Sequence, residues 1–333
     1  METSEFTVSV IIPVFNNEST LQRAISSCLK QTHLPVEIIL VNNNSTDNSQ
    51  IIINENLLRN PEIIVALQEN KPGANAARNA GLRAATGNWI QLLDADDELL
   101  PCKLKHQSDI VSNHPEVDVI YADSLEFIFN YNENRYVVFR ENNTEKDIVT
   151  GLIHSRLGRT NANLWRFSML ENVNFFDESK TSNQEYFLML SMFRAGAVFI
   201  RDADINTKIY VDGDSISRTS SPKRSIEMLS TRLSYFEELS ENLYIRDKKY
   251  LGYMSVIRKK MNLSFYNNYY NYRKFCESEL SQIKLKYFLN PSLSEKLITH
   301  AHQIYAQYCP KKGMSKYIIF IYYFFAKMGK LTN

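Results

Sequence analysis

The chain has 333 residues, of which 44% are apolar and 23% charged, and its formal net charge is +1. These values are typical of a globular protein that is long enough for one large domain with an appendage or for two domains. Its cysteines (Cys28, Cys102, Cys276 and Cys309) form no C-x-x-C pair, which argues against a zinc site or a disulfide framework and suits a reducing cytoplasm. The first residues lack a basic segment followed by an apolar one, so we expect no signal peptide.

The small net charge hides an asymmetry between the two ends of the chain. Residues 241–333 carry 16 Lys and Arg against 5 Asp and Glu, whereas residues 1–240 carry 22 basic and 32 acidic side chains. The acidic N-terminal part and the basic C-terminal part of the chain predict two regions with different partners.

The first hundred residues alternate between strand and helix patterns. Apolar runs rich in β-branched residues predict buried strands, and helices with one apolar face stand between them. The expected strands are 8–14, 36–41, 63–67 and 88–93; the expected helices begin at Ser19 or Thr20 and span about 48–58 and 74–85. Strand–helix units at this spacing predict an α/β fold with a mostly parallel sheet, right-handed crossovers and helices on both faces.

The later residues predict a more mixed order of elements. We expect a helix from Pro101 to about Asn113, a strand at 118–121, an antiparallel ribbon at 125–139, an irregular segment at 160–176, a helix at 183–195, and short strands at 198–200 and 208–211. Beyond about Ser220 the pattern is helical, with Ile226, Leu229, Leu233 and Phe236 at helical spacing. We therefore divide the chain into a domain of residues 1–220, with halves 1–113 and 114–220, and a helical, basic and aromatic region of residues 221–333.

Three carboxylates, Asp94, Asp96 and Asp97, follow the apolar run Trp89–Leu93. A strand that ends here presents them at its carboxyl end, the edge where open α/β sheets bind ligands. Two carboxylates separated by one residue can share a Mg²⁺ or Mn²⁺ ion. An acidic turn that caps the helix near Pro101 explains the same residues, and this segment alone does not decide between the two interpretations.

Three other features belong to the same expected crevice. Residues 42–47 follow the second strand, and their amides can pair with a base edge, although a polar turn with a helix cap is the simpler interpretation. Arg78 lies on a helix of small residues, where it either reaches diphosphate oxygens or faces solvent. Glu185 lies at the start of a helix that Ser182 or Asn183 would cap. It can act as a general base if it faces the crevice, but its position alone favours a helix-stabilising acid.

The order of the segments PVFNN, VNNNSTD, GANAARNAGLRAATGNWIQLLDADD and FDES…NQEYFLMLSMFRAG closely resembles that of the inverting family 2 glycosyltransferases of bacterial type, which have the GT-A fold. The resemblance covers about residues 7–218. It implies a nucleotide-sugar transferase fold, a nucleotide-sugar donor in the crevice of the sheet, and Mn²⁺ or Mg²⁺ on the diphosphate of that donor.

The resemblance also implies roles for individual residues. The metal-holding DXD motif of the family falls on Asp94 and Asp96 with Asp97 adjacent, the arginine of its A-A-R-N block falls on Arg78, and its P-x-[YF]-N element falls on Pro13, Phe15 and Asn16. Its late acidic pair falls on Gln184 and Glu185, so Glu185 is the expected base. It would remove the proton of an acceptor hydroxyl as that oxygen attacks the anomeric carbon from the opposite face, which inverts the configuration.

Two further segments depart from the family pattern. The family commonly has D-D-G-S where this chain has Asn42-Asn43-Asn44-Ser45; an asparagine oxygen can still accept from uracil N3–H but brings no charge. The family often has a histidine near the metal where this chain has Asp212, which can ligate a cation or cap a turn. We therefore expect Asn42 and Asn43 at the nucleotide and Asp212 at the metal.

The basic C-terminal region has two interpretations. Phe265–Phe275 and Lys316–Lys330 mix cationic and aromatic residues, and the apolar run within the second segment is only ten residues long, too short to span about 30 Å of hydrocarbon. Such a composition suits peripheral contact with the anionic inner leaflet, which would bring the protein to a lipid-linked acceptor. The alternative is a helical bundle that packs on the first domain or forms a homodimer.

These inferences predict a cytoplasmic, metal-dependent inverting glycosyltransferase of the hexosyltransferase type, at the inner face of the plasma membrane if the tail binds lipid. It would move a sugar from a UDP-sugar to an acceptor hydroxyl in surface polysaccharide or glycolipid assembly. The alternative is a catalytically silent nucleotide-sugar-binding protein with an interaction role, since Asn42, Asn43, Gln184 and Asp212 depart from the pattern. A Rossmann oxidoreductase is disfavoured because PVFNNES stands where G-x-G-x-x-G is needed, and the acidic N-terminal part disfavours a nucleic-acid partner.

Overall fold

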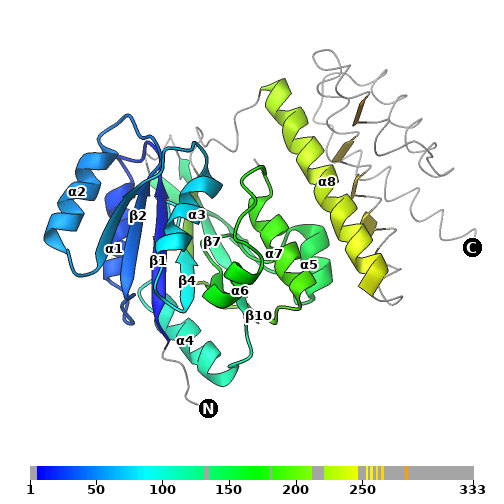
Figure 1. The fold of residues 1–333 in the computed structure, drawn as a ribbon, viewed down its shortest axis with the longest axis horizontal. Helices are drawn as coiled ribbons and strands as arrows, with labels where there is room; N and C mark the ends of the chain where they lie inside the picture. Colours follow the sequence, from blue (N-terminus) through cyan, green and yellow to red (C-terminus); the bar gives the residue numbers. More distant parts are fainter. Residues whose placement is uncertain are drawn as a thin grey trace, which may run out of the picture. The chain divides into compact units, whose positions relative to one another are not determined.

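The computed structural model describes residues 6–130, 135–180, 182–211 and 221–246, together with Tyr253, Val256, Ile257, Lys260, Met261, Ser264, Phe265, Gln282 and Ile283. The chain divides into two compact units, Met1–Arg218 and Thr219–Asn333. Figure 1 shows the elements of both units in sequence colours.

The first unit is built on a seven-stranded sheet. Its strands lie in the order β10 (Phe199–Asp202), β6 (Val119–Ala122), β9 (Leu164–Arg166), β4 (Trp89–Leu92), β1 (Val8–Val14), β2 (Glu37–Asn42) and β3 (Ile64–Gln68). Strand β9 is antiparallel to both of its neighbours, and the other neighbouring strands are parallel. All strands except β9 therefore end at the same edge, and the expected mostly parallel sheet is confirmed.

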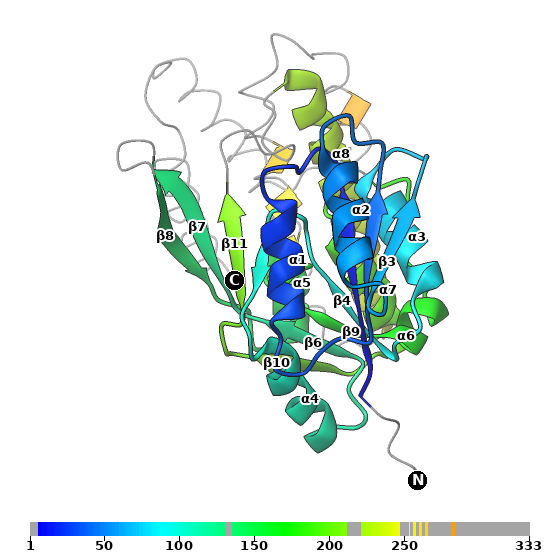
Figure 2. The ribbon, with the colours of Figure 1, turned by 90° about the vertical axis from the view of Figure 1, so that its left-hand side faces the viewer.

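Alternating side chains of β1 are buried against helices on both faces of this sheet. Val8, Val10 and Ile12 belong to one apolar cluster with Leu21 and Ile25 of α1 (Leu21–Leu29). On the opposite face, Ile11 lies so close to Gly81 of α3 (Ala74–Ala84) that a Cβ on the glycine would overlap it. Figure 2 shows α1 and α3 on opposite sides of the sheet, as a buried parallel sheet requires.

A second, four-stranded sheet stands beside the first (Figure 2). Its order is β5 (Glu98–Leu99), β11 (Thr207–Val211), β7 (Ser124–Asn130) and β8 (Arg135–Asn142). The remaining helices of the first unit are α2 (Ser49–Arg59), α4 (Lys103–Asn113), α5 (Ile148–His154), α6 (Phe167–Asn172) and α7 (Gln184–Ala195). Helices α5 and α6 both contact α7.

The expectation of an irregular segment at 160–176 is wrong. Leu164 and Trp165 are fully buried because β9 inserts between β4 and β6 in the centre of the large sheet, and α6 follows directly. The expected helix caps also differ, since neither Thr20 nor Asn183 makes a side-chain hydrogen bond at its N-cap position. Asn183 instead takes a left-handed backbone conformation with φ 51°.

The described part of the second unit is mainly helix α8 (Pro222–Arg246). Ile226, Leu229, Leu233 and Phe236 are buried, as their helical spacing predicts. Apart from Phe265, the segments Phe265–Phe275 and Lys316–Lys330 lie outside the described residues. Among the residues that the structure describes, no helix combines the length and the apolar character needed to cross a membrane.

Candidate active site

The acidic turn leaves the large sheet at the carboxyl end of β4. Leu93 is the last residue bonded to β1, through its N–H to the carbonyl of Ile11 at 2.9 Å, and the N–H of Asp97 then donates to the carbonyl of Asp94 at 3.1 Å. The side chain of Asp94 is 38% exposed, whereas Asp97 is buried. The three aspartates therefore do not face the same environment.

Asp97 points into the protein. Its Oδ1 accepts from the N–H of Tyr210 at 2.8 Å, and its Oδ2 accepts from Nδ2 of Asn161. Burial, together with the negative charges of Asp96 and Asp94, raises the pKa of Asp97 well above its usual value. The carboxylate of Asp97 is committed to Tyr210 and Asn161 and holds the turn; a contact between Asp97 and the donor stays a prediction.

Arg23 of α1 supports the same turn from the other side. It donates through Nη2 to the carbonyl of Asp96, and the central carbon of its guanidinium lies 3.7 Å from the centroid of the Tyr210 ring. This cation–π contact and the backbone bond hold Asp96 between α1 and β11. Arg23 was not predicted from the sequence as a site residue, because no local pattern links it to a turn more than 70 residues later.

Arg78 connects the acidic turn to the start of α7. Its Nη2 lies 2.8 Å from Oδ1 of Asp94, and its Nη1 donates to Oε1 of Gln184 at 2.9 Å. The residue is only 7% exposed and its guanidinium lies 5.6 Å from the centroid of the Phe176 ring. One buried cation thus brings together Asp94 and Gln184, which are 90 positions apart in the sequence. The alternative of a solvent-facing arginine is excluded.

Two asparagines on the same face of α3 hold the segment that leads into α7. Asn79 donates to the carbonyl of Phe176 at 2.9 Å and accepts from the N–H of Phe176 at 3.1 Å. Asn75 donates to the carbonyl of Asp177 at 2.8 Å. Neither asparagine was predicted to have this role, although Arg78 and Asn79 lie three and four positions after Asn75, which places all three on one helix face.

Glu185 is half-buried in the first turn of α7. The next residue fixes this turn, because the hydroxyl of Tyr186 donates to the carbonyl of Gly158 at 3.1 Å. Burial lowers the pKa of Arg159, but its hydrogen bond to Glu126 and the negative charges of Glu126 and Glu185 outweigh burial and raise that pKa. Glu185 therefore lies near the cationic side chain of Arg159. It directly follows Gln184, which accepts a hydrogen bond from Arg78.

The loop after β1 is held by Asn16. This residue has φ 54°, and its Oδ1 accepts from the N–H of Thr46 at 2.7 Å. Pro13 is half-buried in β1, and Phe15 is 46% exposed beside the loop. An exposed aromatic ring at this edge leaves a surface on which a ligand can rest.

Asn42 and Asn43 are committed to the loops around them. Asn42 donates to Oε1 of Gln50 at 2.6 Å and accepts from the N–H of Ser45 at 3.0 Å. Asn43 donates to the carbonyls of Glu69 and Lys71, both at 2.8 Å, and accepts from the N–H of Gly73 at 2.8 Å. Both donors of the Asn43 amide are used, so it shapes the loop before α3. Its Oδ1 has a second lone pair, so the expected place of Asn43 at the nucleotide stays a prediction.

The acidic edge carries the type of ligand that a hard divalent cation takes, although one oxygen of Asp94 is paired with Arg78. Asp94 and Asp96 offer carboxylate oxygens, the ligands that Mg²⁺ and Mn²⁺ prefer. Three carboxylates within four residues, Asp94, Asp96 and Asp97, concentrate negative charge at this edge. The predicted third ligand, Asp212, lies outside the described residues.

Solved structures share this fold. TarS of S. aureus (the 1–349 fragment in complex with UDP-GlcNAc) matches with a TM-score of 0.59 at 17% identity, over 87% of this chain and 77% of that chain. The mannosyltransferase PcManGT from Pyrobaculum calidifontis, in complex with GDP-Man and Mn²⁺, matches with a TM-score of 0.54 at 16% identity, over 92% of this chain and 83% of that chain. At such identities the likeness shows the fold alone, and it confirms the expected GT-A fold.

Sequence comparison identifies the family. Residues 9–204 match the family described as Glycosyl transferase family 2, and the chain therefore belongs to family 2 of the glycosyltransferases. An uncharacterized glycosyltransferase of Rickettsia prowazekii is 29% identical over 196 residues, which are 58% of this chain and 60% of that protein. The chain spans 60% or less of the length of the first curated relatives it matches.

Proposed function

We propose that this protein is a metal-dependent inverting glycosyltransferase that moves a sugar from a UDP-sugar to an acceptor hydroxyl. The observation that carries the proposal is the position of Arg78, which binds Asp94 of the acidic turn and Gln184 beside Glu185. In this proposal Arg78 supplies positive charge for the diphosphate, and Glu185, next to Gln184, supplies a carboxylate for the acceptor. The UDP-sugar complex of TarS supports the choice of donor.

In this proposal residues 1–113 form the nucleotide-binding half and residues 114–220 the acceptor half. Pro13, Phe15 and Asn16 line the base and ribose, with Asn42 and Asn43 shaping the loops around them. Asp94 and Asp96 would hold Mn²⁺ or Mg²⁺, with Asp212 as a further ligand, and the ion would supply positive charge for the diphosphate. The Mn²⁺ complex of PcManGT supports this assignment.

The chemical step is a single displacement. Glu185 accepts the proton of the acceptor hydroxyl as that oxygen bonds to the anomeric carbon. The bond between the anomeric carbon and the diphosphate oxygen breaks, the nucleoside diphosphate leaves with both electrons, and Arg78 stabilises the negative charge that develops there. Attack from the face opposite the leaving group inverts the configuration.

Donor turnover tests this proposal directly. The full chain is incubated with UDP-, GDP-, CDP- and dTDP-sugars with and without Mn²⁺, and release of nucleoside diphosphate is measured. We expect one donor class, UDP, to be turned over only with metal. Glu185→Gln should reduce turnover by roughly 10²–10⁴-fold while UDP still raises the melting temperature, because a ligand of the folded state stabilises it.

Glu171→Gln is the matched control, since Glu171 is an exposed glutamate on α6, and it should keep wild-type turnover. Full turnover by the Glu185 variant would contradict the role given to that residue. A UDP-dependent rise in melting temperature without turnover of any donor would favour a silent nucleotide-sugar-binding protein over an enzyme.

We further propose that the acceptor is a growing surface glycan or a lipid-linked sugar, reached by a cytoplasmic protein at the inner membrane face. The support is the charge of residues 241–333, with 16 basic against 5 acidic side chains. The full chain should co-sediment with anionic but not neutral vesicles, and deletion of Lys316–Asn333 should abolish this. If that deletion instead converts a dimer to a monomer, the region is a homodimer interface.

A further inference from the structure

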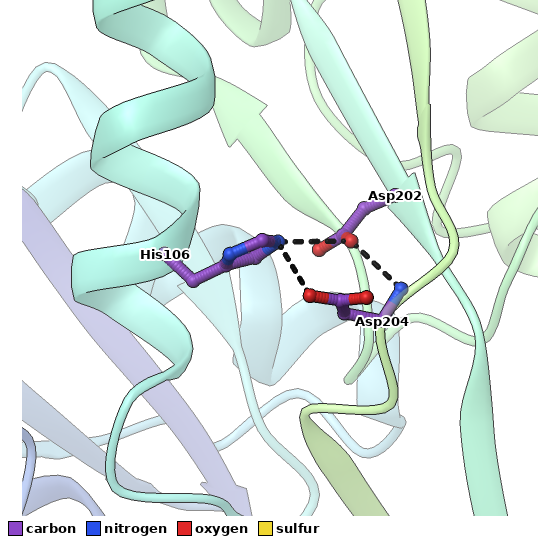
Figure 3. Close-up of side chains that lie close together, drawn as sticks. All are labelled: His106, Asp202 and Asp204. Carbon is purple, nitrogen blue, oxygen red and sulfur yellow. Dashed lines mark hydrogen bonds and ion pairs between the residues drawn. The ribbon is translucent and has the colours of Figure 1, made fainter.

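A second group of metal-ligating side chains lies between α4 and the end of β10. Nε2 of His106 is 3.1 Å from Oδ1 of Asp202 and 3.5 Å from Oδ2 of Asp204. Ligand atoms of these three residues all lie within 4.8 Å of one another. The imidazole and the two carboxylates point toward one another (Figure 3).

The group differs from an ordinary exposed acidic cluster in its burial. Asp202 is only 4% exposed, and within the described part of the chain its buried Oδ2 has no hydrogen-bond partner. Its Oδ1 already accepts from the N–H of Asp204 at 2.9 Å, which fixes the carboxylate in place. A buried carboxylate oxygen without a partner carries a large desolvation cost, and a bound cation would remove that cost.

This group is separate from the proposed active site. Asp202 ends β10, and strands β6 and β9 lie between β10 and β4. Three strand spacings correspond to roughly 14 Å, so the two acidic sites do not share ligands. His106 and Asp204 also take no part in the hydrogen bonds of Arg78, Asp94 or Gln184.

We propose that His106, Asp202 and Asp204 form a binding site for a divalent transition-metal cation such as Zn²⁺. One imidazole nitrogen and two carboxylate oxygens are ligands that Zn²⁺ accepts, with water in the fourth tetrahedral position. The two carboxylates bring more negative charge than the nearby Lys103 offsets, and a divalent ion would compensate the excess.

The ion would join α4 to the connection between β10 and β11. This connection already contacts the chain just before α4, where the N–H of Leu100 donates to the carbonyl of Asn206 at 2.9 Å. The following strand, β11, provides the N–H of Tyr210 that binds Asp97. A cation at His106 would therefore stiffen the support of the acidic turn without touching the donor.

Zinc binding to the full chain tests this inference. The protein is freed of metal with EDTA, dialysed, and titrated with Zn²⁺ against a chelating dye without nucleotide. We expect one Zn²⁺ per chain and a rise in melting temperature. His106→Ala and Asp204→Asn should each weaken binding at least about tenfold, because each removes a ligand. Asp202→Asn is not used, since a buried substitution can prevent folding.

Two variants serve as controls. His114→Ala removes an exposed histidine at the C-cap of the same helix and should leave zinc binding unchanged. Asp96→Asn changes the metal site of the proposed active site and should leave zinc binding at His106 unchanged. A failure of the zinc inference can therefore be told apart from a failure of the proposed function. Equal zinc binding by wild type and His106→Ala, or no binding by the wild type, would overturn the inference in favour of a simple ion pair between His106 and the carboxylates.

Discussion

The N–H of Tyr210 donates to Oδ1 of Asp97 at 2.8 Å and joins β11 to a turn 113 residues earlier in the chain. This bond connects the two sheets at the point where the large sheet presents its acidic residues. Since Asn161 also donates to Asp97, two distant segments fix one buried carboxylate. The geometry of Asp94 and Asp96 thus depends on residues outside the motif that contains them.

Replacing Asp97 separates its structural role from its charge. Asp97→Ala should lower the free energy of unfolding by about 2–4 kcal/mol, because the N–H of Tyr210 and the amide of Asn161 each lose their acceptor. Asp97→Asn keeps a carbonyl oxygen for Tyr210. The Oδ1 of Asn161 has no partner among the described residues, so the Asn161 amide can turn and accept from the new NH2 group, and the loss should be smaller than in Asp97→Ala. Urea unfolding in EDTA measures both. An equal decrease in the free energy of unfolding in Asp97→Ala and Asp97→Asn would show that the negative charge of Asp97 is itself required.

Substitution of Arg78 tests the link between the acidic turn and α7. Arg78→Lys keeps the charge but cannot donate to Asp94 and Gln184 at the same time in planar geometry. Turnover of the donor should fall on the order of 100-fold, since small displacements of reacting groups have effects of this size. Arg83→Lys, on the exposed end of the same helix, should be nearly unaffected. Wild-type turnover in Arg78→Lys would show that Arg78 is not needed to position the site.

The sequence predicted those parts of the fold in which local pattern and burial agree. The run Val8–Val14 is β1 with the expected bounds, because a parallel strand buried on both faces consists almost entirely of apolar residues. The three-residue strand β9 was missed because Leu164–Arg166 carries no alternation of its own. Its place between β4 and β6 is decided by tertiary packing, which a short window cannot contain.

The candidate site was only partly predictable for a related reason. Polar residues at strand ends identified the edge, but the pattern D-A-D-D does not tell which carboxylate points inward; the partner of Asp97 is a backbone N–H more than a hundred residues away. Likewise, the hydrogen bonds of Asn43 to Glu69, Lys71 and Gly73 depend on how β2 meets the following loop. The residue types indicated that this edge of the sheet is polar, but the directions in which the side chains of Asp97 and Asn43 point depend on the fold.

The close approach of α3 to β1 predicts a specific interaction between two positions. A Cβ at Gly81 would overlap the side chain of Ile11, so Gly81→Ala should lower the free energy of unfolding by about 1–3 kcal/mol despite the better helix propensity of alanine. Ile11→Ala is itself destabilising because it leaves a cavity in the core, but in that background Gly81→Ala should cost less, because the methyl groups that overlap its Cβ are gone. A double-mutant cycle by urea unfolding measures the coupling, and strictly additive effects would contradict it.

The buried lysine of α4 predicts a pH-dependent stability. Lys103 is fully buried, and burial lowers its pKa from 10.5 to about 7, against the opposing effect of the negative charge of Asp202. From about pH 7 to 10.5 the unfolded chain holds a proton that the folded chain has released, so this residue makes the protein more stable as pH rises. Below that range its burial penalty is fully present.

Lys103→Met removes this penalty and should therefore raise the melting temperature, most at or below about pH 7 and progressively less toward pH 10. The carbonyl of Ala162, which accepts from Lys103 at 2.6 Å, keeps Gln107 as a donor at 3.4 Å, so the lost bond is partly replaced. Lys105→Met, which removes an exposed lysine paired with Asp109 on the same helix, should show no such trend. Melting temperatures of the wild type, Lys103→Met and Lys105→Met, measured in EDTA from about pH 6 to 10, test this pH dependence. A gain for Lys103→Met that does not vary with pH would show that Lys103 is charged in the folded protein throughout this range.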